Sequence, residues 1–298
     1  MWRLQMIQTV PDEARPEKNA VCNLPAGWRW SFCGWIFLLL GFILVERALA
    51  TGMPENRGCL AALLVVAATV STLISLSRQL PAQNVLLAAT LIAVGGGVAQ
   101  MIGTLVFVPP VRFQPASPGV SWFPSALPWW VPLTWIVILL NSRGTARVIL
   151  RPWRENRAYG IWLLSLGTAL CLAIEMELEP FAARMNGHWF WDFRQQGLNW
   201  HESPAAMLPA WTAATALVLA LATPALIQKK PVELPPDYRP AALWILLNIL
   251  CVTDAIARHS PCAAAFGAGA VLAVVLCMVR GARRQRLAGT LAPLSRDS

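Results

Sequence analysis

The sequence predicts an all-α fold, a polytopic membrane helix bundle of about eight transmembrane helices. Hydrophobic residues occupy 56% of the 298 positions and charged residues only 13%, a balance outside the range of soluble globular domains. The apolar residues fall into segments of about 20 residues, the length that crosses the hydrocarbon core of a bilayer. The segments lie at residues 30–50, 58–76, 84–108, 126–142, 158–178, 208–227, 241–257 and 262–279.

The eight segments differ in strength. We expect the helix at 30–50 to be retained, because Glu46 and Arg47 interrupt the pattern of a cleavable signal peptide. The fourth and seventh segments are the weakest predictions, since they are short or contain polar residues, and seven helices remain an alternative. The connections are too short for a separate soluble domain. We therefore expect one membrane domain over 1–298, with a cytoplasmic N-terminal segment at 1–28 and a basic cytoplasmic tail at 280–298.

Lysine and arginine residues predict the orientation of the helices. With eight helices, both termini and the connections 77–83, 143–157 and 228–240 share one side and carry eighteen of the 24 basic residues. The other side carries six. By the positive-inside rule both termini face the cytoplasm. Topology thus explains the net charge of +9, and we expect no nucleic-acid binding because no basic soluble module is present to provide it.

A shared spacing predicts a parallel internal repeat of the third and fourth spans in the fifth and sixth. The same Pro-x6-Trp pattern opens two segments, from Pro128 to Trp135 and from Pro204 to Trp211. A polar residue precedes each proline at a similar distance: Gln100 lies 28 positions before the first, and Glu175 lies 29 before the second. Sites between repeats are common in membrane proteins. The alternative is that tryptophan and proline only mark the membrane interface.

Three carboxylates end the fifth segment. Glu175 and Glu179 are four positions apart and project from nearly the same face of a helix, whereas Glu177 points away. Pro180 disfavours helical geometry at Glu179, so we expect the pair on the last turn. Two ionised carboxylates near hydrocarbon are costly, and at least one is expected to be neutral at pH 7. Such an acid can protonate a weak base such as an alkene, although acids at a helix end can also be simply solvated.

Tryptophan is the second component of the predicted site, with fifteen in the chain. An indole face stabilises a nearby cation and packs against a flat polyene; anchoring in the interfacial belt is the alternative. The candidate substrate-binding residues are Trp135, Trp189, Trp191, Trp200, Trp211 and Gln100. Asp192 and His201, in the loop after the acids, could position a water molecule or act as a base. Either could equally be an ordinary polar loop residue.

The sequence predicts neither a metal nor a cofactor. Three histidines in the whole chain exclude the histidine-rich membrane di-iron enzymes, and no metalloprotease-type zinc motif is present. Glycine-rich nucleotide loops and aspartate-rich diphosphate motifs are also missing from the sequence.

The chain resembles the bacterial and archaeal carotenoid biosynthesis membrane proteins that include the carotenoid 1′,2′-hydratases. The resemblance spans roughly residues 95–220, within a family-like core at 84–227. The family carries an acidic pair four apart with a proline after the second acid, then Trp-x-Trp, then a proline and a tryptophan. Here these read Glu175, Glu179-Pro180, Trp189-Phe190-Trp191 and Pro204 to Trp211. The chain departs from the family at Gln100, where a glutamate is usual, and at Met207, where an asparagine is usual.

The resemblance implies cofactor-independent addition of water across the terminal 1′,2′ double bond of an acyclic carotenoid ψ end group, catalysed by a lyase. The substrate would be of the lycopene or γ-carotene type, with membrane lipids and other carotenoid enzymes as partners. The acid would be the Glu175/Glu179 pair, with tryptophans shielding the cation and Asp192 or His201 positioning the water. Two alternatives remain: an end-group cyclase or isomerase, in which the cation loses a proton, and a non-catalytic carotenoid- or lipid-binding membrane subunit.

Overall fold

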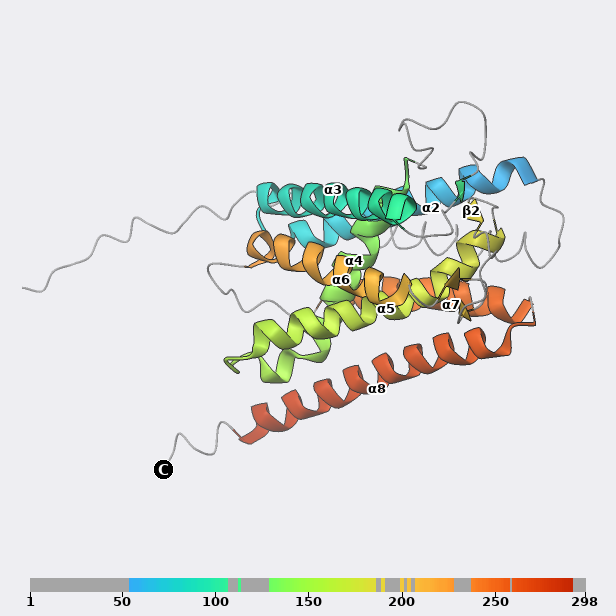
Figure 1. Ribbon diagram of the computed structural model, residues 1–298. Helices are drawn as coiled ribbons and strands as arrows, with labels where there is room; N and C mark the ends of the chain where they lie inside the picture. The colour runs from blue at the N-terminus through green and yellow to red at the C-terminus, as the bar shows by residue number, and fades with distance from the viewer. Residues whose placement is uncertain are drawn as a thin grey trace, which may run out of the picture.

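The structure is a computed structural model and is described over residues 54–106, 112–113, 129–185, 189–190, 199–200, 203–204, 207–227, 237–257 and 259–291. Over these residues the chain forms a bundle of long α-helices (Figure 1). The helices are α2 (Pro54–Ser77), α3 (Ala82–Val106), α4 (Val131–Ile149), α5 (Tyr159–Met185), α6 (Met207–Ala222), α7 (Arg239–Ala257) and α8 (Pro261–Leu291). Two 3-10 helices, η1 (Arg151–Trp153) and η2 (Thr223–Leu226), follow α4 and α6.

A helix lies at each predicted segment from 58–76 onward, whereas the predicted helix at 30–50 and the segment 1–28 lie outside the described residues. Within the described residues, five helices are long and apolar enough to cross a membrane, which confirms the prediction of a helical membrane protein. They are Ala82–Gly103, Tyr159–Glu179, Leu208–Leu226, Arg239–Ala257 and Pro261–Arg284. Helix α8 continues to Leu291, so the tail predicted from position 280 begins as helix.

Helix α4 does not belong to those five, because it carries Asn141, Ser142 and Arg143 near its middle. It lies at the centre of the bundle against α2, α3, α5 and α7, and it is buried along most of its length. Polar side chains in a membrane helix are tolerated where they face protein. Asn141 Nδ2 donates to Thr72 Oγ1 of α2 at 2.8 Å. The weak signal of the fourth segment thus reflects a helix covered by other helices.

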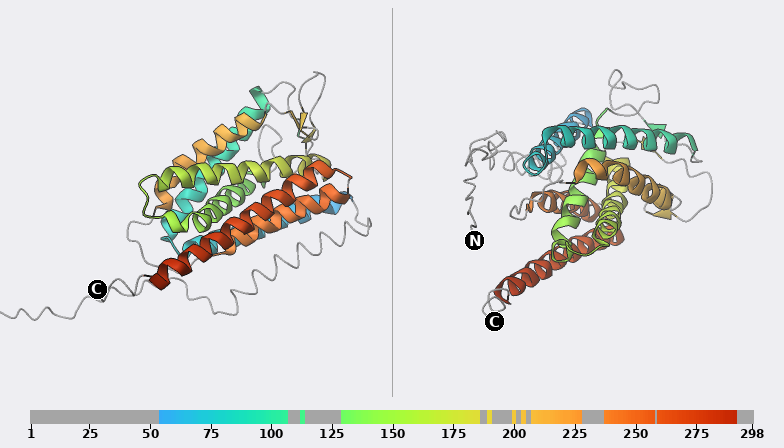
Figure 2. Two further views of the ribbon diagram at one scale, coloured as in Figure 1. Left: turned by 90° about the horizontal axis from the view of Figure 1, so that it is seen from below. Right: turned by 90° about the vertical axis from the view of Figure 1, so that its left-hand side faces the viewer.

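Two glycines allow neighbouring helices to approach α4 closely. A Cβ added to Gly96 of α3 would lie 2.3 Å from the ring Cγ of Trp135 in α4, and one on Gly144 of α4 would lie 2.5 Å from Pro240 Cβ at the start of α7. Small residues at such crossings are characteristic of membrane helix packing, which depends on van der Waals contact. Figure 2 shows α7 and α8 side by side along much of their length.

Short strands join the connections at one end of the bundle, which we call the outer end; there α5 ends and α6 begins. Strand β1 (Arg112–Phe113), between α3 and α4, pairs antiparallel with β2 (Trp189–Phe190), between α5 and α6. Strand β3 (Asn199–Trp200) pairs antiparallel with β4 (Ser203–Pro204). The connections that the repeat hypothesis relates are therefore in direct contact. The opposite end, where α2 turns into α3, is called the inner end.

Candidate functional site

The three carboxylates of α5 lie inside the bundle. Glu175, Glu177 and Glu179 are 9%, 3% and 8% exposed. The prediction that the acidic pair sits on the last turn is wrong, because α5 continues past Pro180 to Met185. Simple solvation at a helix end therefore does not describe these acids.

A tryptophan hydrogen bond explains why α5 continues through Pro180. Proline has no N–H, so the carbonyl four residues earlier, that of Met176, loses its partner within the helix. The indole Nε1 of Trp200, in β3, donates to this oxygen at 3.0 Å. The Trp200 ring also meets Phe266 of α8 edge-on, with ring centroids 5.6 Å apart. A residue that is distant in sequence thus replaces the missing backbone donor.

Glu175 lies on the side of α5 that faces α4, and Glu179 follows it by one helical turn. The two carboxyl groups are close enough to interact electrostatically. One turn before Glu175, Cys171 is fully buried, and its Sγ lies 3.9 Å from the backbone oxygen of Ile138 in α4. Residues four apart share a helix face, so Glu175 lies on the α4 side as well.

The crossing of three helices fixes the level of the acid along the bundle. A Cβ added to Gly167 of α5 would lie 3.1 Å from Leu219 Cδ2 of α6 and 3.7 Å from Arg143 Cα of α4. These three positions therefore share one level. From this level α5 continues to the outer end. Helices α4 and α6 begin at the outer end and run back to this level.

Counting eight residues outward from that level, about 12 Å along each helix, leads to Glu175 on α5, Trp135 on α4 and Trp211 on α6. The two tryptophans are 3% and 7% exposed, and their rings contact each other with centroids 5.4 Å apart at 42°. The acid and the two indoles of the Pro-x6-Trp patterns therefore lie at one depth. Trp211 Nε1 is buried and has no hydrogen-bond acceptor within the described part of the chain, so it is a donor that a ligand or water could engage.

Gln100 lies beside this group, on α3. It is 8% exposed and follows Gly96 by four residues, which places both on one face of α3. Because Gly96 packs directly on the Trp135 ring, Gln100 lies one turn further outward on the face that α3 turns to α4. The structure thus gathers Glu175, Trp135, Trp211 and Gln100 around the outer half of α4.

Glu177 belongs to the other side of α5. A Cβ added to Gly267 of α8 would lie 3.1 Å from both Cδ and Oε2 of Glu177, and 2.6 Å from Val252 Cγ2 of α7. The Oε1 atom of Glu177 is buried, with no hydrogen-bond partner among the residues that the structure describes. Glu177 therefore packs in the contact of α5, α7 and α8, the side on which Trp200 also meets Phe266.

Four of the predicted site residues cannot be placed as side chains. Trp189 lies in β2, opposite Phe113 of β1, but its side chain lies outside the described residues. Trp191, Asp192 and His201 lie outside them entirely. Within the described ranges, no group of three or more His, Cys, Asp or Glu side chains could hold a metal ion.

Sequence reasoning overlooked two buried polar residues of α7. Asp254 is 5% exposed and Asn248 is 1% exposed, and Asn248 Oδ1 has no partner in the described part of the chain. Both stand inside the predicted segment 241–257. The rule that singled out Glu175, that an acid within a membrane helix marks a functional or structural site, would have selected Asp254 as well.

Comparison with known proteins yields a family. A family model described as carotenoid biosynthesis protein matches residues 59–279. The matched region contains α3 to α7, most of α2 and α8, and every acid and tryptophan of the candidate site. Comparisons with curated proteins and with solved structures found no match.

Proposed function

The chain belongs to the carotenoid biosynthesis protein family, and we propose that it hydrates the terminal 1′,2′ double bond of an acyclic carotenoid ψ end group. The family gives a role in carotenoid biosynthesis, and the long apolar helices make the chain an integral membrane protein. The observation that carries the specific reaction is the common level of Glu175 and the Trp135–Trp211 ring pair. An acid and a pair of indoles in mutual contact thus share one depth inside an apolar bundle.

The reaction requires a proton, a cation site and one water molecule. In this proposal the neutral carboxyl group of Glu175 transfers its proton to C2′, and the π electrons form the new C–H bond. The tertiary cation at C1′ then takes a water molecule through its oxygen. The resulting oxonium returns a proton to the carboxylate, so the acid is restored and the product is a tertiary 1′-hydroxyl. The step balances without a redox cofactor.

The tryptophan pair suits the cationic step. An indole face stabilises a nearby cation by roughly 0.5–2 kcal/mol, and a flat ring also packs against a conjugated chain. Glu179, one helical turn from Glu175 on α5, is the second member of the acidic pair in this proposal. Asp192 and His201 remain our candidates for positioning the water.

We also propose eight spans with both termini in the cytoplasm of a bacterial inner membrane, and a parallel repeat within one domain. The basic residues, eighteen of 24 on one side, support the orientation. The contact between Trp135 and Trp211 supports the repeat, as do the buried positions of Gln100 and Glu175. In the repeat Gln100 corresponds to Glu175, so proton delivery would rest on the α5–α6 half alone.

Pigment analysis tests the reaction. The chain is expressed in a host that accumulates lycopene or γ-carotene, and the carotenoids are separated and identified by mass. Product heavier by one water supports hydration. A ring or a shifted double bond of unchanged mass would identify a cyclase or an isomerase. Unchanged pigment that copurifies with the protein would identify a non-catalytic binding subunit.

The double substitution Glu175→Gln with Glu179→Gln tests the assignment of the acid. It should abolish conversion while protein level and bound pigment persist. Glu177→Gln is the matched control, since it removes a buried carboxyl group from the other side of the same helix. Product from the double variant would show that the acid lies elsewhere.

A further inference from the structure

Two arginines in the inner half of α4 form hydrogen bonds to neutral groups that lie nearer the inner end of the bundle. Arg143 is 6% exposed, and its Nη2 donates to the backbone oxygen of Leu226 at 3.4 Å. Arg147, one turn later, donates from Nη1 to Gln79 Oε1 at 2.9 Å. Within the described part of the chain neither forms an ion pair with a carboxylate. The two guanidinium groups share a helix face and repel each other.

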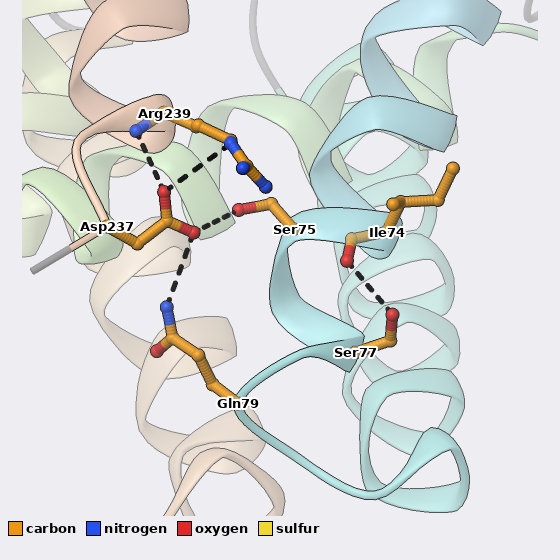
Figure 3. Close-up of polar contacts among 6 residues, drawn as sticks. All are labelled: Ile74, Ser75, Ser77, Gln79, Asp237 and Arg239. Atoms are coloured by element: carbon orange, nitrogen blue, oxygen red, sulfur yellow. Dashed lines mark hydrogen bonds and ion pairs between the residues drawn. The ribbon is translucent and has the colours of Figure 1, made fainter. Parts of the chain in front are cut away.

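Asp237, the carboxylate that the structure describes in this polar network, binds other groups than the two arginines of α4. Asp237 Oδ2 accepts from Ser75 Oγ at 2.6 Å and from Gln79 Nε2 at 3.4 Å (Figure 3). Its Oδ1 accepts from the backbone N–H of Arg239 at 3.1 Å and lies 3.9 Å from Arg239 Nε. Asp237 thus fixes the start of α7 to the end of α2. The Gln79 amide stands between it and Arg147, donating to one and accepting from the other.

Among the side chains that the structure describes, this arrangement leaves a local excess of positive charge. A guanidinium has five N–H donors, and the Leu226 carbonyl, which ends η2, takes one of those of Arg143. A buried charge without a counter-ion is costly. Arg78 adds a further positive charge in the turn next to Gln79. An anion held by both guanidinium groups would remove their mutual repulsion.

The position and the donor type indicate the chemistry of that anion. Guanidinium groups match phosphate oxygens in a bidentate geometry. Arg143 stands six residues before Ile149, the end of α4, or about 9 Å from the inner end of the helix. A long arginine side chain can extend its head over such a distance toward the level of the lipid headgroups. Phosphate is the anion present at that level in a membrane.

We propose that Arg143 and Arg147 form a binding site for a phosphate group at the inner end of the bundle, filled in the membrane by the headgroup of an anionic phospholipid. The site is independent of the proposed reaction, since it lies eight residues or more from the level of Trp135 along α4. The hydrogen bond to Leu226 positions Arg143, and the Gln79 amide positions Arg147.

Thermal unfolding of the purified full chain tests the site. The protein is kept in neutral detergent and its tryptophan fluorescence is followed on heating, alone, with phosphatidylglycerol, with phosphatidylcholine, or with inorganic phosphate. Phosphatidylglycerol should raise the unfolding temperature by several degrees more than phosphatidylcholine, because a ligand that binds the folded state stabilises it. Native mass spectrometry should show retained anionic lipid. If no addition shifts the unfolding temperature, the site is overturned.

Variants assign the effect to the two arginines. Arg147→Gln should lose at least half of the shift given by phosphatidylglycerol, and so should Arg143→Lys, which keeps the charge but lacks the planar fork. Arg154→Gln is the control, because Arg154 is exposed at the same end and its loss removes the same charge. Equal shifts in all four proteins would show that neither arginine binds the lipid, and equal losses in Arg147→Gln and Arg154→Gln would reduce the effect to general surface charge; either result would overturn the site. If inorganic phosphate raised the unfolding temperature as much as phosphatidylglycerol does, the phosphate site would stand, but its assignment to a lipid headgroup would be wrong.

Discussion

The two sides of α5 surround their carboxylates differently. On one side Glu175 lies at the level of Trp135 and Trp211, next to the central helix. On the other side Glu177 packs against Gly267 of α8 and near Val252 of α7. Both acids are nearly inaccessible to solvent, Glu175 at 9% and Glu177 at 3% exposed. Burial alone therefore does not distinguish a reactive acid from a structural one. The difference must come from the groups that surround each carboxylate.

The largest expected difference between the sides is in conversion of the carotenoid. Glu175→Gln should reduce it by about 10²- to 10⁴-fold, the contribution of a general acid, because the amide cannot donate the proton. Glu177→Gln should leave it within about threefold, well below the contribution of a general acid. The measurement is product formed per unit of membrane protein in the pigment-accumulating host.

Equal losses in the two single variants would break the comparison. They would mean either that both carboxyl groups take part in proton transfer or that any amide on this stretch of α5 disturbs folding. Thermal unfolding of both variants separates these explanations, since only the second lowers the unfolding temperature.

The next effect concerns the tryptophan side. Gly96→Ala places a Cβ where the Trp135 ring lies, at 2.3 Å, and a rigid ring cannot yield cheaply. Overpacking of this kind costs about 1–3 kcal/mol, and moving the ring should lower conversion as well. Gly97→Ala is the matched control, because the nearest atom is Pro132 Cγ at 3.8 Å; alanine's better helix propensity should leave stability unchanged or slightly higher. Full activity in Gly96→Ala would show that the position of the Trp135 ring does not affect the reaction.

The bond between Trp200 and α5 gives the third effect, on stability more than on activity. Trp200→Phe keeps a ring against Phe266 but leaves the Met176 carbonyl without a donor, at a cost of about 1–3 kcal/mol. Trp162→Phe is the control, since Trp162 is 39% exposed on the same helix. Unfolding temperatures of the two variants provide the measurement. A loss of conversion larger than the loss of folded protein would show that Trp200 also contributes to the substrate site, as the sequence predicts.

Local sequence rules explain both the success and the failure in this region. The four-residue spacing correctly separated Glu175 and Glu179 from Glu177, because helical periodicity depends only on positions along the chain. The same reasoning ended α5 too early, because the helix survives Pro180 through the indole N–H of Trp200, 24 residues after the carbonyl that it satisfies. A contact of that separation leaves no local signal.

Hydropathy predicts where the helices lie in the sequence better than it predicts whether they face lipid or other helices. Segment 126–142 was weak on the hydropathy scale, yet α4 is the central helix, at 131–149. Hydropathy assumes a lipid neighbour, whereas Asn141 and Arg143 face other helices. The same assumption hides buried polar groups of α7 such as Asp254. Which residues meet at one level, as Glu175, Trp135 and Trp211 do, depends on helix crossings that the sequence does not state.

The smallest expected effect is a gain in stability on the Glu177 side. Methionine has nearly the length of glutamate and a flexible, apolar end that can adapt to Gly267 and Val252. Glu177→Met removes a buried oxygen that has no partner in the described part of the chain, and replacing an unsatisfied polar group by an apolar one should stabilise the fold by about 1 kcal/mol. The unfolding temperature should rise slightly with conversion retained, whereas Glu177→Gln, which keeps a polar end, should show no such rise. A lower unfolding temperature or lost conversion in Glu177→Met would show that this carboxyl group has a partner or a role that its surroundings do not reveal, and the distinction between the two sides of α5 would fail.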